Sequence, residues 1–442
     1  MKHSRPSRRL QLRLRLTVNR IAAGGRWPVQ FPHETQHNLR NFFFDGVYAS
    51  GSDAITITYL TLYLLALGAS SGDIGWLNAL SSLAAVVLLL PGAMLVDRFG
   101  NRQKTVVIAG GWFGRIPLLL MALIPFFLKG PSAIYVIIAL KVVLDGARNL
   151  GLPAWVSLTA DIVPLAWRGR YFGNRNLVMG ISAMVITLII GEVITRIGTP
   201  GGYQWAMGLA FSIGMLSTFY FSRIKEPTAS EARTTPSRYS FSALRSTLRG
   251  DRHFLVFCLY TAFWTLSLNI AGPFFSVYLV QTLGATASIV GITTIITRIS
   301  GIPAQRFFGV LADKWGPRKL TLVSGFLVPI LPLMWLFIRS PWGVVPINIL
   351  SGIFWAGYNL ATFNLLLEVS PDEQRARYSA MYQIFVAGSA AAGAAIGGLI
   401  ADQWGIRSLF LISGIGRFTS ALFFLFGLYR KQYPAIPLDS NK

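Results

Sequence analysis

Charged side chains stand inside long apolar stretches of this sequence, where they could bind a charged solute or carry a proton. Lys141, Asp145 and Arg148 are spaced by four and then three residues in "LKVVLDGARN", so one helical face carries a cation, an anion and a second cation. An ionised side chain in apolar surroundings is costly and needs a charged partner or a polar cavity. The triplet is therefore either a self-neutralised structural cluster or a site for a substrate or a proton.

Further candidates lie at a similar depth in other apolar stretches. Asp53 could pair with Arg148 or with Arg298, or it could carry a coupling proton, and Asp45 is a weaker candidate of the same kind. The polar and aromatic candidates are Trp264, Asn269, Trp355, Tyr358 and Asn359. Such a lining suits a small organic solute, and helix–helix packing is the alternative interpretation of these residues.

Two more arginines, Arg115 and Arg417, stand inside apolar stretches, so cations outnumber acids there. If this excess faces a cavity, the solute is expected to be anionic or zwitterionic. If the two arginines lie at the periphery, that expectation falls away.

The composition predicts an integral membrane protein. Of 442 residues, 53% are hydrophobic and 13% are charged, against about 25% charged residues in a soluble domain. The net charge of +23 falls in short loops and at the chain ends, which favours a lipid bilayer and not a nucleic acid as the partner. The single cysteine, Cys258, allows no internal disulfide. The four histidines lie outside the apolar stretches or, for His253, at the very end of one, so neither a metal site nor a cofactor is expected.

The apolar stretches are long enough to cross a bilayer as helices. The sequence predicts twelve membrane-spanning helices, at about residues 40–68, 74–96, 105–128, 132–159, 171–197, 202–223, 253–281, 286–311, 320–339, 342–368, 378–400 and 406–430. The fold class is therefore an all-α, multi-pass membrane protein.

The breaks between these stretches alternate between basic and nearly uncharged, and Arg175 is counted with Arg168 and Arg170 in one of the basic breaks. The basic breaks and the two chain ends together hold 30 of the 40 Lys and Arg residues. The positive-inside rule then places both termini on the cytoplasmic side of the cytoplasmic (inner) membrane. The tryptophans at the opposite, uncharged ends, which suit interface anchors, are Trp76, Trp205, Trp342 and Trp404.

Two charged motifs occur twice. "LVDRFGNRQK" at 95–104 is repeated by "LADKWGPRKL" at 311–320, and "DIVPLAWRGRY" at 161–171 is repeated by "EVSPDEQRARY" at 368–378. In the first pair Asp97, Arg98, Gly100 and Arg102 match Asp313, Lys314, Gly316 and Arg318. In the second pair Asp161, Arg168 and Arg170 match Glu368, Arg375 and Arg377. The chain is thus a duplicated six-span half, and such parallel repeats occur among transporters.

The repeat divides the chain into five predicted parts. They are a basic cytoplasmic tail at 1–39, an N-terminal six-helix bundle at 40–223, a cytoplasmic linker at 224–252, a C-terminal six-helix bundle at 253–431 and a cytoplasmic tail at 432–442. The first tail carries eight Lys and Arg residues before Arg40 and is expected to touch anionic lipid. An organellar transit peptide is the alternative for this tail.

The doubled motif resembles the signature of the major facilitator superfamily, in which a glycine precedes an Asp–Arg/Lys pair, a second glycine and clustered Arg or Lys. "GVLADKWGPRK" matches it almost fully, whereas "MLVDRFGNRQK" is preceded by Ala93 at the position of the first glycine. The resemblance covers all twelve spans. It implies two pseudo-symmetric six-helix bundles, with spans 1, 4, 7 and 10 around a central cavity.

The resemblance also implies a role for the charged motifs. Asp97 would meet the start of span 11 near Arg375 and Arg377, and Asp313 would meet the start of span 5 near Arg168 and Arg170. A carboxylate facing a helix N-terminus is stabilising, so these contacts would latch the cytoplasmic side shut until the halves rock apart. The alternative is that the motifs only set the topology and cap the hairpins, with Gly100 and Gly316 allowing the tight reversal.

The function expected from the resemblance is secondary active transport of a small organic solute by alternating access, coupled in one version to protons. A proton-antiporting drug or metabolite exporter is the alternative, although span 5 lacks a Gly-Pro-rich run and span 11 has Ala394 where that run would place proline. No metalloprotease or nucleotide-binding motif is present, so a membrane-embedded enzyme is only a remote alternative. The expected partners are the solute, the bilayer and a coupling proton, and the protein is expected to be a monomer.

Overall fold

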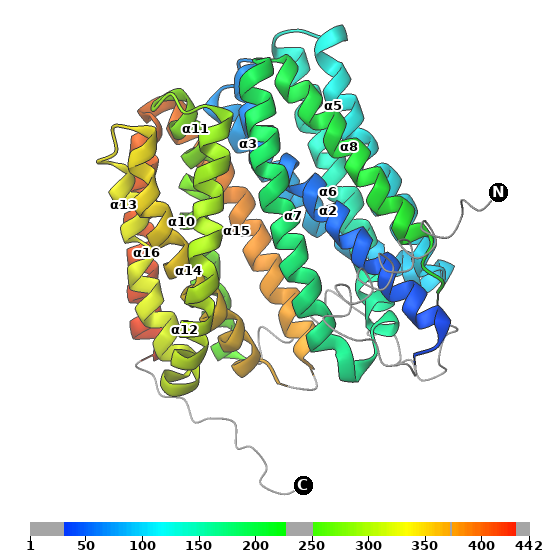
Figure 1. Ribbon diagram of the computed structural model, residues 1–442. Helices are drawn as coiled ribbons and strands as arrows, with labels where there is room; N and C mark the ends of the chain where they lie inside the picture. Colours follow the sequence, from blue (N-terminus) through cyan, green and yellow to red (C-terminus); the bar gives the residue numbers. More distant parts are fainter. Residues whose placement is uncertain (1–30, 227–250, 372–373, 430–442) are drawn as a thin grey trace, which may run out of the picture. The chain divides into compact units, whose positions relative to one another are not determined.

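The computed structural model describes residues 31–226, 251–371 and 374–429, and within these ranges it is helical without strands (Figure 1). The elements are α2 (His33–Ala66), α3 (Ser71–Phe99), α4 (Arg102–Thr105), the π-helix η1 (Val106–Phe113), α5 (Ile116–Phe127), α6 (Pro131–Ile162), η2 (Leu165–Trp167), α7 (Arg168–Ile197), α8 (Gly201–Ser222), α10 (Arg252–Ala271), α11 (Phe274–Gln281), α12 (Ala287–Leu327), α13 (Ile330–Trp335), η3 (Pro341–Gly343), α14 (Val344–Glu368), α15 (Arg375–Trp404), α16 (Ile406–Phe424) and η5 (Leu425–Tyr429). The prediction of an all-helical chain is confirmed.

The predicted spans differ from the helices where glycine and proline interrupt the backbone. The predicted range 253–281 is divided at Gly272 and Pro273 into α10 and α11. The predicted range 286–311 and the start of 320–339 fall within α12, which runs to Leu327 but is broken at Gly316. Gly316 is non-helical inside α12, with φ 73°, so the chain turns there without a separate loop.

The predicted count of twelve membrane spans is not confirmed, because only nine segments of the described residues are long and apolar enough to count as spans. One of the nine, residues 287–335, covers two of the predicted ranges. Two long helices, α2 and α6, are not among the nine. Both are too polar: α2 contains Asp53 among serines and threonines, and α6 carries the Lys141 triplet.

The chain divides into two compact units. Within the described residues, unit 1 comprises 31–67 and 87–226, and unit 2 comprises 68–86, 251–371 and 374–429. The boundary therefore falls inside α3, whose first half belongs to unit 2. The linker predicted at 224–252 lies mostly outside the described residues.

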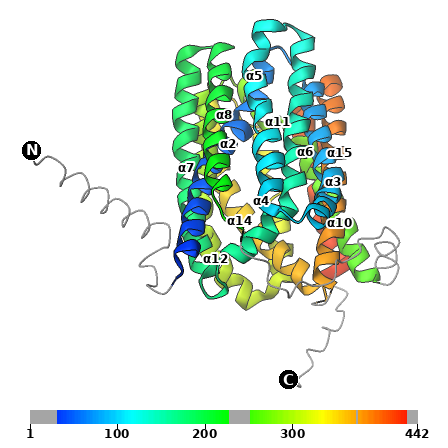
Figure 2. The same cartoon turned by 90° about the vertical axis from the view of Figure 1, so that its right-hand side faces the viewer.

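In unit 1, α2 packs between α7 and α8, and these helices run side by side in both views (Figures 1 and 2). Tyrosine hydroxyls join the helices by donating to backbone carbonyls of their neighbours: Tyr59 to Thr187 at 2.6 Å and Tyr63 to Met121 at 2.9 Å. Hydrogen bonds and close packing replace the hydrophobic driving force between helices in a bilayer, so such bonds fix the position of α2.

In unit 2, α10 packs on α15 and α16, and α12 packs on α14. The first half of α3 lies against α15 through small residues. A Cβ on Gly75 would come within 2.7 Å of the Ala394 carbonyl, so glycine is needed for this close approach. Beside it, the Asp402 carboxylate accepts a hydrogen bond from the Gly72 amide at 3.0 Å, at the N-terminus of α3.

Candidate functional site

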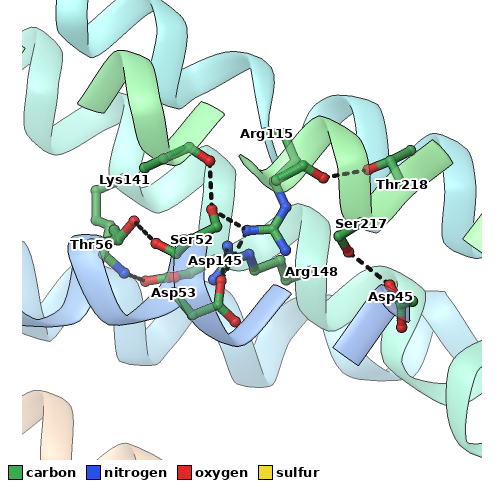
Figure 3. Close-up of polar contacts among 12 residues, drawn as sticks. Asp45, Ser52, Asp53, Thr56, Arg115, Lys141, Asp145, Arg148, Ser217 and Thr218 are labelled. Atoms are coloured by element: carbon green, nitrogen blue, oxygen red, sulfur yellow. Dashed lines mark hydrogen bonds and ion pairs between the residues drawn. The ribbon is translucent and has the colours of Figure 1, made fainter. Parts of the chain in front are cut away.

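Asp53, near the middle of α2, is held by two arginines from two other segments. Its Oδ1 accepts hydrogen bonds from Arg148 Nη2 on α6, at 2.6 Å, and from Arg115 Nη1, at 2.9 Å (Figure 3). The Asp53 side chain is 35% exposed and the Arg115 side chain only 7%. The carboxylate therefore sits at the edge of a buried cationic pair and can still be reached by a small molecule or a proton.

Arg115 owes its position to an unusual backbone. The segment before it is the π-helix η1, in which the Gly114 amide donates to the Ala109 carbonyl five residues earlier, at 2.8 Å. Gly214 on α8 makes room for the side chain, because a Cβ there would come within 2.7 Å of Arg115 Cδ. Ser52 accepts a second bond from Arg115 Nη1 at 2.9 Å. The guanidinium is thus fixed from three sides.

The Lys141 triplet on α6 is divided between two partnerships. Lys141 donates to Asp145 on the next turn, whereas Arg148 turns to Asp53 on α2 (Figure 3). The sequence interpretation of a single self-neutralised cluster therefore holds for Lys141 and Asp145 and is wrong for Arg148. The predicted pairing of Asp53 with Arg148 is confirmed, and Arg298 lies exposed on α12 in unit 2.

A second ionic group lies about two turns earlier on α2. Asp45 accepts a hydrogen bond from the Ser217 hydroxyl at 2.7 Å and faces Arg175 Nη2 at 3.5 Å. Arg175 also donates to the Phe42 carbonyl at 3.0 Å and lies over the Phe42 ring. Gly46 permits this arrangement, because a Cβ there would lie 2.4 Å from Arg175 Nη2.

These ionic groups line one cavity within unit 1, with a volume of about 420 Å³. Its charged lining residues are Asp45, Asp53, Arg115, Arg148 and Arg175. Its walls are mainly apolar and come from η1, α6, α7 and α8, with Val106, Val107, Leu152, Trp155, Met179 and Phe221 among them. A concave apolar site with a few convergent charges is typical of small-molecule binding.

Unit 2 brings aromatic residues together. Trp264 on α10 stacks on Tyr358 of α14, with ring centroids 4.4 Å apart, and Trp355 meets Tyr358 edge-on at 5.7 Å. Tyr260, which the sequence interpretation missed, shares a 3.0 Å hydrogen bond with the Tyr358 hydroxyl. The other two candidates do not join this cluster: the Asn269 amide bonds to Thr265 of its own helix, and Asn359 is exposed.

The repeated motifs form a matching ion pair in each unit. Arg102 donates to Asp161 and to Glu226, both at 2.6 Å, and Arg318 donates to Glu368 at 2.7 Å. Arg102 and Arg318 match in the sequence repeat, and so do Asp161 and Glu368. The structure thus pairs the two repeated motifs with each other inside each unit.

The remaining gating candidates are less connected. Gly100 and Gly316 both adopt positive φ, 66° and 73°, as the expected tight reversals require. Arg168 donates to carbonyls at the C-terminal end of α6, and Arg170 lies over the Trp167 ring. Asp313 and Lys314 are exposed. The side chains of Asp97, Arg98, Arg375 and Arg377 lie outside the described residues, so the latch stays a prediction.

Three arginines lie deeper than at least one interpretation of the sequence placed them. Arg115 was given a peripheral position as one alternative, yet it is central, and the charge rule for apolar stretches was the signal for it. Arg175 was counted with a basic loop, yet it lies buried inside α7. Arg417 is also buried, at 2% exposure, so its peripheral alternative is wrong as well.

The comparisons with known proteins agree with this architecture. The chain is 26% identical over 161 residues to an uncharacterized MFS-type transporter of Methanocaldococcus jannaschii, a match that spans 36% of this chain and only 42% of that relative. Longer matches are a multidrug resistance protein MdtG of Dickeya zeae, 23% identical over 91% of this chain and 97% of the relative, and a probable galactarate/D-glucarate transporter GudP of Bacillus subtilis, 22% identical over 81% of each.

A solved structure shares the fold. The chain superimposes on the crystal structure of a mutant of the nucleoside transporter NupG with a TM-score of 0.72, over 87% of this chain and 98% of that one, at 14% identity. These relatives and neighbours are transporters and not enzymes. The family model of the Major Facilitator Superfamily matches residues 43–270 and 262–440, almost the whole of the two halves, and the chain therefore belongs to the Major Facilitator Superfamily.

Proposed function

We propose that the protein is a proton-coupled secondary transporter that moves a small organic solute by alternating access. The observation that carries this proposal is Asp53, a partly exposed carboxylate bracketed by Arg115 and Arg148 at the wall of a cavity. An ionisable residue in a membrane interior marks an ion or proton pathway by default. Protonation of Asp53 would release the two arginines, so one proton changes the charge that the cavity presents.

The proposed topology has twelve spans, with both termini in the cytoplasm. We place the protein in the cytoplasmic (inner) membrane, as a monomer. The two polar helices α2 and α6 complete the count, together with the division of residues 287–335 at Gly316. The basic breaks support the orientation. The four expected interface tryptophans are all exposed near the ends of their helical segments, Trp76 at 50%, Trp205 at 64%, Trp342 at 53% and Trp404 at 69%.

Transport into proteoliposomes tests this function. The purified full-length protein is reconstituted, a pH gradient is imposed, and a library of small solutes is screened for gradient-driven accumulation or expulsion. Asp53→Asn should lose the response to the gradient while Asp73→Asn, which alters a partly exposed acid at the start of α3, should keep it. An Asp53→Asn protein that still follows the pH gradient would exclude Asp53 as the proton carrier.

A drug exporter of the same fold is the second candidate. The likeness to MdtG over 91% of the chain favours it. The aromatic cluster does not add to this support, because Trp264 and Tyr358 are buried, at 2% and 5% exposure. Protection of a drug-sensitive host by the expressed protein, lost in Asp53→Asn, would favour export over uptake.

A further inference from the structure

We propose that the solute carried in the unit 1 cavity is a small organic anion, whose carboxylate binds Arg115 and Arg148 when Asp53 is protonated. This inference rests on the proposed function and names the chemical class of its solute. It is carried by three observations: the balance of charge in the cavity, the unused donors of its arginines, and the position of Asp53 between them.

The charge of the cavity is positive by one. Three arginines and two carboxylates line it, and all other lining residues are uncharged. The Arg175 guanidinium is largely committed, since it bonds to Phe42 and faces Asp45. The surplus cation therefore belongs to the group formed by Arg115, Arg148 and Asp53. An uncompensated positive charge in a low-dielectric site is unfavourable, so the cavity favours an anionic solute over a neutral or cationic one.

Arg115 keeps a donor without a partner. Its Nε has no hydrogen-bond partner among the described residues, although the residue is buried, at 6% exposure. A guanidinium has five N–H groups in a planar fork that matches a carboxylate. The recorded bonds use Nη1 of Arg115 and Nη2 of Arg148, so further N–H groups of both side chains can serve a ligand.

Asp53 occupies the place where the ligand's carboxylate would bind. When Asp53 takes up a proton from water, it loses its charge, and an incoming carboxylate restores one negative charge beside the two guanidinium groups. One proton and one negative charge enter together, so the net charge of the cavity does not change. The charged groups around Asp53 are Arg115, Arg148, Lys141 and Asp145 from the packed segments and Asp45 from its own helix, with Arg175 beside Asp45.

The size and walls of the cavity limit the ligand. A volume of about 420 Å³ lies within the usual range of about 300–1,000 Å³ for small-molecule sites. The walls are mostly apolar, and Ser217 and Thr218 add hydroxyls. The likeness to a probable galactarate/D-glucarate transporter agrees with an organic acid as the solute.

Matched probes test the charge of the ligand directly. The thermal stability of the purified full-length protein is measured with gluconate against glucitol and with benzoate against benzamide, at one ionic strength and at pH 5 and pH 8. We expect at least one carboxylate to raise the Tm saturably at pH 5, with less effect at pH 8, while its uncharged partner has no effect. The proposal is wrong if no carboxylate stabilises the protein more than its uncharged counterpart.

Three variants separate binding from folding. Arg148→Gln, at a partly exposed arginine, should weaken the apparent affinity about tenfold or more. Asp53→Asn imitates the protonated carboxyl and should bind the carboxylate equally well at pH 5 and pH 8. Arg196→Gln, which removes an exposed arginine at the end of α7, is the matched control and should bind as the wild type does. Unchanged affinity in Arg148→Gln would contradict the proposal.

The fate of the proposed function can be read separately. If a neutral or cationic solute is transported by the pH gradient and this transport requires Asp53, proton coupling is upheld and the proposal of an anionic solute is wrong. Carboxylate binding with the expected variant pattern, but no gradient-driven transport of the bound acid, would uphold the binding site and overturn the transport function.

Discussion

The interiors of the two units differ in kind. In unit 1 the interior side chains include ionic groups, with Asp53 and Asp45 each set against arginines from other segments. In unit 2 they include aromatic rings, with Trp264 stacked on Tyr358, and the one bond of the buried cation Arg417 within the described part of the chain goes to the backbone carbonyl of Leu268, at 3.4 Å. The two halves of the duplicated chain therefore share a helical arrangement but differ inside, with ion pairs in unit 1 and stacked aromatic rings in unit 2.

The outer motifs show the opposite tendency. Arg102 with Asp161 in unit 1 and Arg318 with Glu368 in unit 2 are matching pairs at matching positions. They differ in burial, since the Arg102 side chain is 5% exposed and the Arg318 side chain 34%. The matching ion pairs are thus expected to contribute more to the free energy of unfolding in unit 1 than in unit 2, and variants can measure this difference.

The largest expected effect is at the deepest ion pair. Asp45→Ala leaves Arg175 buried without its carboxylate, and breaking a buried pair in this way costs about 3–5 kcal/mol. The free energy of unfolding in detergent should fall by that amount. Asp313→Ala, at an exposed acid in unit 2, should leave it unchanged. Equal stability of the two variants would show that the ionic interior of unit 1 is dispensable for folding.

The repeated pairs come next. Arg102→Met removes a buried guanidinium from two carboxylates and should lower the free energy of unfolding by about 2–3 kcal/mol. Arg318→Met removes the half-exposed counterpart and should cost less than about 1 kcal/mol. Chemical denaturation of both variants checks the difference. A larger loss for Arg318→Met would mean that burial does not rank these two pairs.

Replacing Gly214, the glycine beside Arg115, should lower the stability by a smaller amount. Gly214→Ala places a Cβ 2.7 Å from Arg115 Cδ, and such overpacking costs about 1–3 kcal/mol. Gly325→Ala in unit 2 is the matched control, because its Cβ would meet only Ala421, at 3.8 Å. Thermal denaturation should show a loss for the first and none for the second. A neutral Gly214→Ala would mean that Arg115 has room to move.

The aromatic cluster should respond least. Tyr358→Phe keeps the stack on Trp264 and removes the hydroxyl bond to Tyr260, at a cost of about 0.5–1.5 kcal/mol. Asp53-dependent coupling, measured as the pH response of transport, should be intact in this variant. Loss of the pH response in Tyr358→Phe would contradict the division between an ionic and an aromatic unit.

The sequence predicted the helices and part of the site, for reasons that particular residues make clear. Asp53 and Arg148 could be found because isolated charges in apolar stretches need each other. Arg115 could not be oriented, because the π-helix before it adds a residue to the turn and changes the face on which the arginine lies. Arg175 was read as a topology signal, since a basic residue near a loop carries no mark of burial.

The twelve predicted spans are not all confirmed, for a related reason. Hydropathy measures how well a helix suits lipid. Helices α2 and α6 have low hydropathy because they carry charged residues of the cavity, so they are not counted as spans by this measure. The helices that a hydropathy criterion discards are therefore the ones with the proposed function. The repeated motifs could have suggested the pairs Arg102–Asp161 and Arg318–Glu368, because two motifs that recur together often touch.

Helix α3 is shared by the two units: its residues up to Val86 belong to unit 2 and its residues from Val87 belong to unit 1. Pro91 lies just beyond that division, and a proline inside a helix leaves the carbonyl four residues earlier, here that of Val87, without its amide donor. The backbone of α3 is therefore least constrained by its own hydrogen bonds within a few residues of the point at which the helix passes from unit 2 to unit 1.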